Sequence, residues 1–118
     1  MSMSYDAYVT AALFDRHGKA VFALGDGTVR FEGGETAAAH KGVALSACLH
    51  PSGEGILTGG DDGAVVWSRG ADVTEIAKIP GRWIESVAAS PESKLIAFAA
   101  GKELHVRDSA DAGFSRVF

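Results

Sequence analysis

Residues 39–68 spell AHKGVALSACLHPSGEGILTGGDDGAVVWS, and this stretch decides the fold. Three short apolar runs alternate with turns in it: VALSACL at 43–49, GILT at 55–58 and AVVW at 64–67. Pro51 fixes its own φ in the first turn, and the Asp-Gly step at 62–63 suits a tight hairpin. The segment 73–79 alternates approximately between apolar and polar residues, which predicts a fourth strand with one exposed face. The pattern therefore predicts a four-stranded antiparallel sheet.

Weaker copies of this pattern lie on both sides of it. Equivalent turns begin at Asp15, His50 and Ser90, which are 35 and then 40 residues apart. The apolar pairs that follow the next turn end at Phe31, Trp67 and Val106, which are 36 and then 39 residues apart. Both spacings increase by a similar amount from the first interval to the second. The chain is therefore predicted to hold three repeats of one structural unit.

The repeats resemble the WD40 family of β-propellers, whose blades are four-stranded units of about 40 residues. The resemblance covers roughly residues 8–118 and rests on His40 before the first strand of the middle unit, the turn at 59–63, and Trp67. It implies an all-β fold of three four-stranded antiparallel blades. Within a single domain of residues 1–118, the expected blades are 8–39, 40–80 and 81–118.

The resemblance also implies a hydrogen-bonded network inside the middle blade. Its members would be His40, Thr58, Asp61 or Asp62, and Trp67. The Trp-Asp pair that names the family is Trp67-Ser68 here. Since side chains alternate faces along a strand, Trp67 shares a face with Val65. The alternative is therefore that Ser68 occupies the place of the family's Trp.

Three segments leave alternatives open. The segment 33–39 has two glycines and three alanines, which is poor strand composition, so a helical turn at 35–40 competes with the short outer strand that we expect. Residues 1–7 are expected to be a flexible lead or to pair with an open strand edge. Residues 109–113 are expected to be a polar turn before a last strand at 114–118. A β-sandwich built from the same strands is the alternative fold.

The composition excludes several classes of protein. Of 118 residues, 47% are hydrophobic and 22% charged, which suffices for a core. The net charge of −4 and the lack of a Lys/Arg run argue against nucleic acid as a primary partner. No stretch of about 18 apolar residues predicts a membrane span. The start of the chain lacks the features of a signal peptide, so a cytoplasmic location is expected by default, with the single cysteine, Cys48, as a buried reduced thiol.

No motif predicts catalysis, a metal or a cofactor. The four histidines, His17, His40, His50 and His105, fall at different landmarks without the spacing of zinc ligands. Two adjacent carboxylates, Asp61 and Asp62, do not make a calcium loop. Ser46 and Ser86 lack a nucleophile motif, and the glycine-rich turn at 59–63 lacks the Lys-Ser/Thr of a phosphate loop. We therefore expect a protein that is not an enzyme.

The pair Arg82-Trp83 is the strongest candidate for binding a partner, because Trp and Arg dominate the energetics of protein interfaces. The alternative is that Trp83 packs between blades as the opening residue of a strand. Lys41, Asp61 and Lys102 fall on loops that should share the face of Arg82, either as binding residues or as solvated charges. The sequence thus predicts a scaffold for a protein or peptide.

A second hypothesis is a ligand-binding or enzymatic propeller with a site in the central channel. The starts of the inner strands offer mainly Thr10, Ser46, Glu85 and Ser86 for such a site. Few of these residues are suited to catalysis.

Three blades do not close a ring, because propellers have typically 4 to 8 blades and each blade covers its neighbour. The chain is therefore expected to be part of a longer propeller, a half that closes into six blades as a homo-oligomer of two copies, or a piece completed by a different chain.

Overall fold

The computed structural model describes residues 6–110 and 114–118, and these residues form twelve β-strands and no helix. The strands are β1 (Val9–Phe14), β2 (Ala20–Leu24), β3 (Thr28–Phe31), β4 (Thr36–Ala38), β5 (Ala44–Leu49), β6 (Ile56–Gly60), β7 (Ala64–Arg69), β8 (Asp72–Lys78), β9 (Ile84–Ser90), β10 (Leu95–Ala100), β11 (Glu103–Asp108) and β12 (Ser115–Val117). No helix that could cross a membrane is found in this described part. Of the lead and the polar turn predicted from the sequence, residues 1–5 and 111–113 lie outside it.

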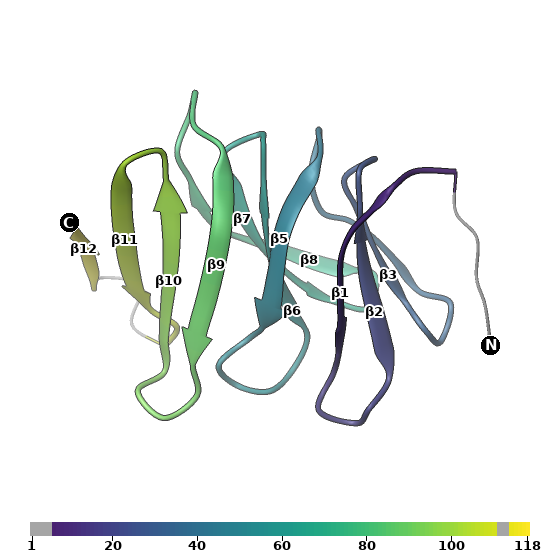
Figure 1. The fold of residues 1–118 in the computed structure, drawn as a ribbon. Coiled ribbons are helices and arrows are strands. Elements are labelled where there is room, and N and C mark those ends of the chain that lie inside the picture. The colour runs from purple at the N-terminus through teal and green to yellow at the C-terminus, as the bar shows by residue number, and fades with distance from the viewer. Residues whose placement is uncertain (1–5, 111–113) are drawn as a thin grey trace.

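The strands form three antiparallel sheets, each built from four consecutive strands: blade 1 (β1–β4), blade 2 (β5–β8) and blade 3 (β9–β12). The blades stand side by side, with β1, β5 and β9 along one edge of the row (Figure 1). The prediction of three four-stranded blades is confirmed, and the strands do not form the alternative β-sandwich.

The composition of segment 33–39 did not prevent strand formation. β4 pairs with β3, placing Ala37 opposite Val29. Both side chains are fully buried between blades 1 and 2. Burial of a small apolar side chain in this contact outweighs the weak strand propensity of alanine, so the expected outer strand forms instead of the helical turn.

Blade 2 is covered on both sides. Ile56 and Leu57 are neighbours on β6 and therefore point to opposite faces, and both are fully buried. Ile56 packs with Val21 and Val29 of blade 1. Leu57 belongs to a second cluster, toward blade 3, whose other buried members are Val65, Ala77, Ile84, Ile96, Phe98 and Ala100. The core thus consists of two interblade layers.

The outward faces of blades 1 and 3 pack against no other described sheet. On blade 1, Phe14 keeps 68% of its surface exposed. On blade 3, Leu104 is 44% exposed, and a shallow hollow of about 310 Å³ is lined mainly by small or apolar side chains. The hollow is lined by Ala88, Ala89, Ser90, Ser93, Leu95, Ala97 and Val106.

Candidate functional site

The segments that lead into β5 and β9 and the turns β6–β7 and β10–β11 meet at one edge of the blades, at the top of Figure 1. We call this edge the upper face and define it by residues 39–43, 61–63, 80–83 and 101–102. All five residues that the sequence predicted for partner binding lie on these segments: Lys41, Asp61, Arg82, Trp83 and Lys102.

Trp83 is more exposed than Trp67, the other tryptophan. It lies directly before β9 and keeps 59% of its surface exposed, whereas the next residue, Ile84, is fully buried. Ile84 sits against Gly59 of blade 2 so closely that a Cβ atom at position 59 would collide with it. The residue that packs between the blades at the start of β9 is therefore Ile84, and the indole of Trp83 stays accessible.

A hollow of about 460 Å³ opens beside Trp83. Arg82, Glu85 and Ser86 contribute its polar groups. Ala99 of β10 and Gly101 of the β10–β11 turn also line it. The guanidinium group of Arg82 lies over Gly101, where a side chain would displace it. Arg82 and Trp83 thus lie at the upper-face end of this hollow, whereas Ser86 and Ala99 lie on the side of blade 3 that faces away from blade 2.

The other three predicted binding residues differ in their exposure and in their contacts within the protein. Lys41 and Lys102 are exposed, and the side chain of neither forms an ion pair with a described residue. Asp61 is only partly exposed, and its Oδ1 accepts the backbone N–H of Val43 at 2.9 Å. Asp61 therefore holds the loop before β5, and one of its two oxygens is committed to that contact.

A buried network lies beneath the upper face in blade 2. Nδ1 of His40 lies 3.0 Å from Oδ1 of Asp62, and Nε2 lies 2.8 Å from Oγ1 of Thr58. Since a carboxylate only accepts, the His40 Nδ1–H donates to Asp62; in the neutral ring, Nε2 then accepts the Thr58 hydroxyl. The structure thus brings together His40, Thr58 and Asp62, three of the residues predicted for the network.

The carboxylate of Asp62 also fixes the surrounding loops. It accepts the backbone N–H groups of Lys41 and Ala64, each at 3.1 Å. Burial alone would raise the pKa of Asp62, but these two N–H groups and the His40 ring outweigh it and lower the pKa. Asp62 therefore stays ionised and holds the segment before β5 against the β6–β7 turn.

Trp67 does not belong to this network, so its placement there from the sequence is corrected. Trp67 and Leu57 are paired residues of β7 and β6, and both face blade 3, whereas Thr58 faces blade 1. Ser68, which lies opposite Ile56, is on the same side as Thr58; it is fully buried, and its hydroxyl has no described partner. Ser68, and not Trp67, therefore lies on the side of β7 that faces the network.

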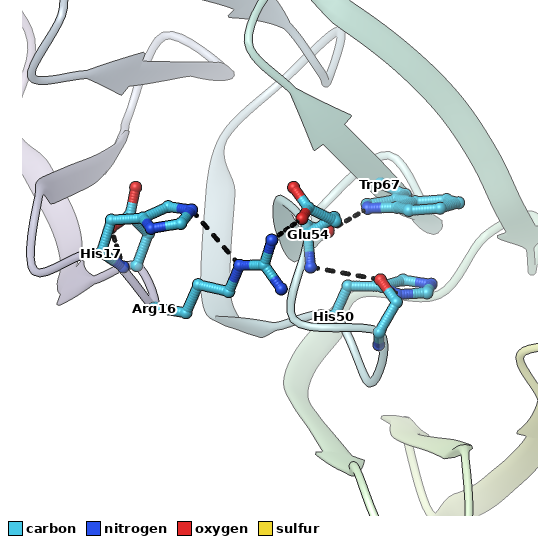
Figure 2. Close-up of polar contacts among 7 residues, drawn as sticks. Arg16, His17, His50, Glu54 and Trp67 are labelled. Atoms are coloured by element: carbon cyan, nitrogen blue, oxygen red, sulfur yellow. Dashed lines mark hydrogen bonds and ion pairs between the residues drawn. The ribbon is translucent and has the colours of Figure 1, made fainter.

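Trp67 instead anchors a cluster at the opposite, lower edge of the blades (Figure 2). Its indole N–H donates to the Glu54 carbonyl at 2.8 Å, and its ring stacks on His50 with centroids 3.8 Å apart. The Arg69 guanidinium carbon lies 4.0 Å from the ring centre. Burial and Arg69 lower the pKa of His50, which favours the neutral ring. The cluster fixes the β5–β6 turn.

An ion pair at the lower edge links two blades. Arg16, in the β1–β2 turn, pairs with the carboxylate of Glu54 in the β5–β6 turn of the next blade. The Nε of Arg16 also donates to Nε2 of His17 at 3.3 Å (Figure 2). The sequence analysis missed this pair. The only available signal was the alignment of the two turns, which places opposite charges in equivalent loops of adjacent blades.

The hydroxyls of the inner strands connect blades. Thr10 donates to the carbonyl of Ala44 in blade 2 at 2.6 Å, and Ser46 donates to the carbonyl of Ile84 in blade 3 at 3.4 Å. Neither has a histidine as a hydrogen-bond partner, so neither is arranged as an activated nucleophile. In the described part of the chain, no group of three His, Cys, Asp or Glu side chains could hold a metal ion.

The comparisons with known proteins agree with this architecture. Residues 35–68 match the family model described as WD domain, G-beta repeat. The structure of Chaetomium thermophilum Sqt1 bound to the N-terminus of the ribosomal protein L10 superimposes with a TM-score of 0.75 at 19% identity, over 97% of this chain and 36% of that one. The C-terminal WD40 domain of Sif2 gives a TM-score of 0.75 at 18% identity, over 90% and 33%. No curated protein sequence matches significantly.

The chain thus has the fold of β-propeller blades and spans about a third of the length of these solved propellers. The WD40 repeat match covers β4 of blade 1 and the first three strands of blade 2, β5–β7. The family resemblance seen in the sequence is confirmed.

Proposed function

We propose that this chain is a non-catalytic, protein-binding part of a WD40 propeller, and that its upper face around Trp83 and Arg82 contacts the partner. The observation that carries the proposal is the exposed Trp83 indole beside a concave surface. A large aromatic side chain is kept in water at a cost, and it is the residue type that most often anchors a protein interface. Sqt1, which shares the fold, binds a segment of a ribosomal protein.

The test is Trp83→Ala, compared with Val73→Ala, which also shortens an exposed apolar side chain but on the outer strand β8. The unfolding midpoints of both variants should stay close to that of the wild type, since neither side chain is in the core. In affinity capture followed by quantitative mass spectrometry, proteins retained by the wild type and Val73→Ala should be lost with Trp83→Ala. Equal capture by all three would refute the upper-face site, and a large loss of stability in Trp83→Ala would assign the residue to the core.

The uncovered faces of blades 1 and 3 support a second part of the proposal, namely that further blades pack on them. Ser46 of β5 is bonded to blade 3, and Ser86 occupies the equivalent position on β9. The Ser86 side chain is exposed and has no described partner. It is therefore placed to donate to the first inner-strand carbonyl of a following blade, as Ser46 does.

A second copy of the chain would provide that blade in a six-bladed ring, and additional propeller sequence would provide it in a longer protein. Light scattering after gel filtration distinguishes these, because a ring of two copies has twice the mass of the 12.2 kDa chain. Phe14→Asp, on the uncovered face of blade 1, should convert such a dimer to a monomer. A wild-type chain that is a folded monomer would exclude the ring of two copies. Separately, we propose a cytoplasmic location, in which Cys48 would stay reduced.

A further inference from the structure

The acidic side chains of the upper face are already engaged within the protein. Asp62 bonds to His40 and to two backbone N–H groups, and Asp61 bonds to Val43. In the neighbouring turns, Asp26 accepts the hydroxyl of Thr28 at 2.6 Å. Each of these carboxylates is thus held by hydrogen-bond donors within the protein, which leaves it less available to the donors of a partner.

The basic side chains of this face are not engaged in the same way. Arg82, Lys102 and Lys41 form no ion pair with a described residue, and all three are exposed. At the lower edge, by contrast, Arg16 is paired with Glu54. A chain with a net charge of −4 therefore presents unpaired positive charges on its upper face.

From this asymmetry we infer that the upper face recognises an acidic peptide segment, with an apolar side chain against Trp83 and carboxylates against Arg82 and Lys102. Arg82 lines the Trp83 hollow, and Lys102 directly follows Gly101, which also lines it, so both charges lie at the upper-face end of the hollow. Complementary charge of this kind selects partners and accelerates their association. The inference deepens the proposed function and depends on the upper face being the binding surface.

The negative charge of Glu85 allows a specific test of the inferred acidic ligand. It also lines the hollow and has no described partner, so it opposes an acidic ligand. Glu85→Gln keeps the shape of the side chain and removes the charge. This variant should bind acidic peptides more tightly, by about twofold to fivefold at low salt. A partner selected for positive charge would instead bind Glu85→Gln more weakly.

A random library of 12-residue peptides displayed on phage tests both levels of the proposal. Clones are selected on the wild type after depletion on Trp83→Ala, and their affinities are then measured as synthetic peptides by fluorescence anisotropy. Enriched peptides should combine Asp or Glu with a large apolar residue. Arg82→Glu with Lys102→Glu should weaken their binding at least about tenfold, and Lys94→Glu, a charge reversal on the β9–β10 turn, should leave it unchanged. Binding should also weaken as salt is raised from 50 to 300 mM.

The outcomes separate the inference from the proposed function. Enrichment of neutral or basic peptides that still require Trp83 would overturn the inference of an acidic ligand. The proposed function, binding at the upper face, would still hold. Failure to enrich any Trp83-dependent peptide would refute both. Tight binding of a fluorescent 20-nucleotide single strand that is lost in the double Glu variant, without acidic peptides among the selected clones, would assign the positive charges to nucleic acid and overturn the inference.

Discussion

Thr58 and Ser68 lie on the same side of the adjacent strands β6 and β7, both fully buried, yet only the Thr58 hydroxyl has a hydrogen-bond partner. Removing the Thr58 hydroxyl in Thr58→Val leaves Nε2 of His40 buried without a partner, which should lower the free energy of unfolding by about 1–3 kcal/mol. Ser68→Ala removes a hydroxyl that is itself unpartnered, so stability should stay constant or rise by up to about 1 kcal/mol. Urea unfolding of the two variants measures both effects. A loss for Ser68→Ala as large as for Thr58→Val would show that Ser68 has a partner.

The lowered pKa of Asp62 predicts a loss of stability in acid. A carboxyl whose pKa is lower in the folded state contributes stability at neutral pH, and that contribution disappears as the pH falls through the unfolded value and then the folded value. The free energy of unfolding should therefore decrease steadily below about pH 5. Asp62→Asn should be less stable at pH 7 and should show a shallower decrease between pH 5 and pH 2. The exposed Asp72→Asn is the control and should follow the wild type at pH 7. If Asp62→Asn has the same pH slope as the wild type, Asp62 is not the titrating group.

Trp67→Phe separates ring packing from the hydrogen bond of the indole. The phenyl ring still stacks on His50, but the donor to the Glu54 carbonyl is lost, which should cost about 1 kcal/mol. Arg16→Ala removes the ion pair with the same Glu54 and should cost less than about 1 kcal/mol, because both side chains are largely exposed. Thermal unfolding of the two variants checks this order. A larger cost for Arg16→Ala would mean that the ion pair, more than the indole, fixes the turn.

Cys48 should react slowly with thiol reagents. Burial raises the pKa of its thiol to about 11, from an ordinary value of 9.0. Because the thiolate is the reactive form, a shift of two units lowers its population at pH 8 about 100-fold relative to an unperturbed cysteine. Reaction with Ellman's reagent should therefore be slow in the native protein and fast in 6 M urea. Native reactivity equal to that of glutathione would contradict the burial of this side chain.

The strand order was predictable because turn residues and apolar runs recur at similar spacings of 35 to 40 residues. The alternation of faces along β7 also predicted that Trp67 and Ser68 point to opposite sides, which the structure has. Strand propensity was a poor guide at 33–39, where burial of Ala37 against Val29 stabilises β4 although its composition does not favour a strand. The composition of one segment cannot predict such a contact with other segments.

The candidate site was only partly predictable. That Arg82 and Trp83 lie in the connection between blades followed from the repeat. That Ile84, and not Trp83, is the buried residue depends on the contact with Gly59 across the interface, 25 positions earlier in the chain. The Arg16–Glu54 pair similarly depends on how two turns face each other once the blades have stacked. Such contacts arise from tertiary packing.

The burial of blade 2 on both sides also determines how the molecule opens. Amide hydrogens of β6 and β7 should exchange with solvent most slowly, because exposing them requires loss of both interblade layers. Amides of β1 and β11, on blades with one bare side, should exchange sooner through partial opening. In a stacked array, each unit is stabilised mainly by its interfaces with its nearest neighbours. Protection should therefore decline from the middle blade toward both ends, and adding a blade at one end should slow exchange chiefly in the blade it touches.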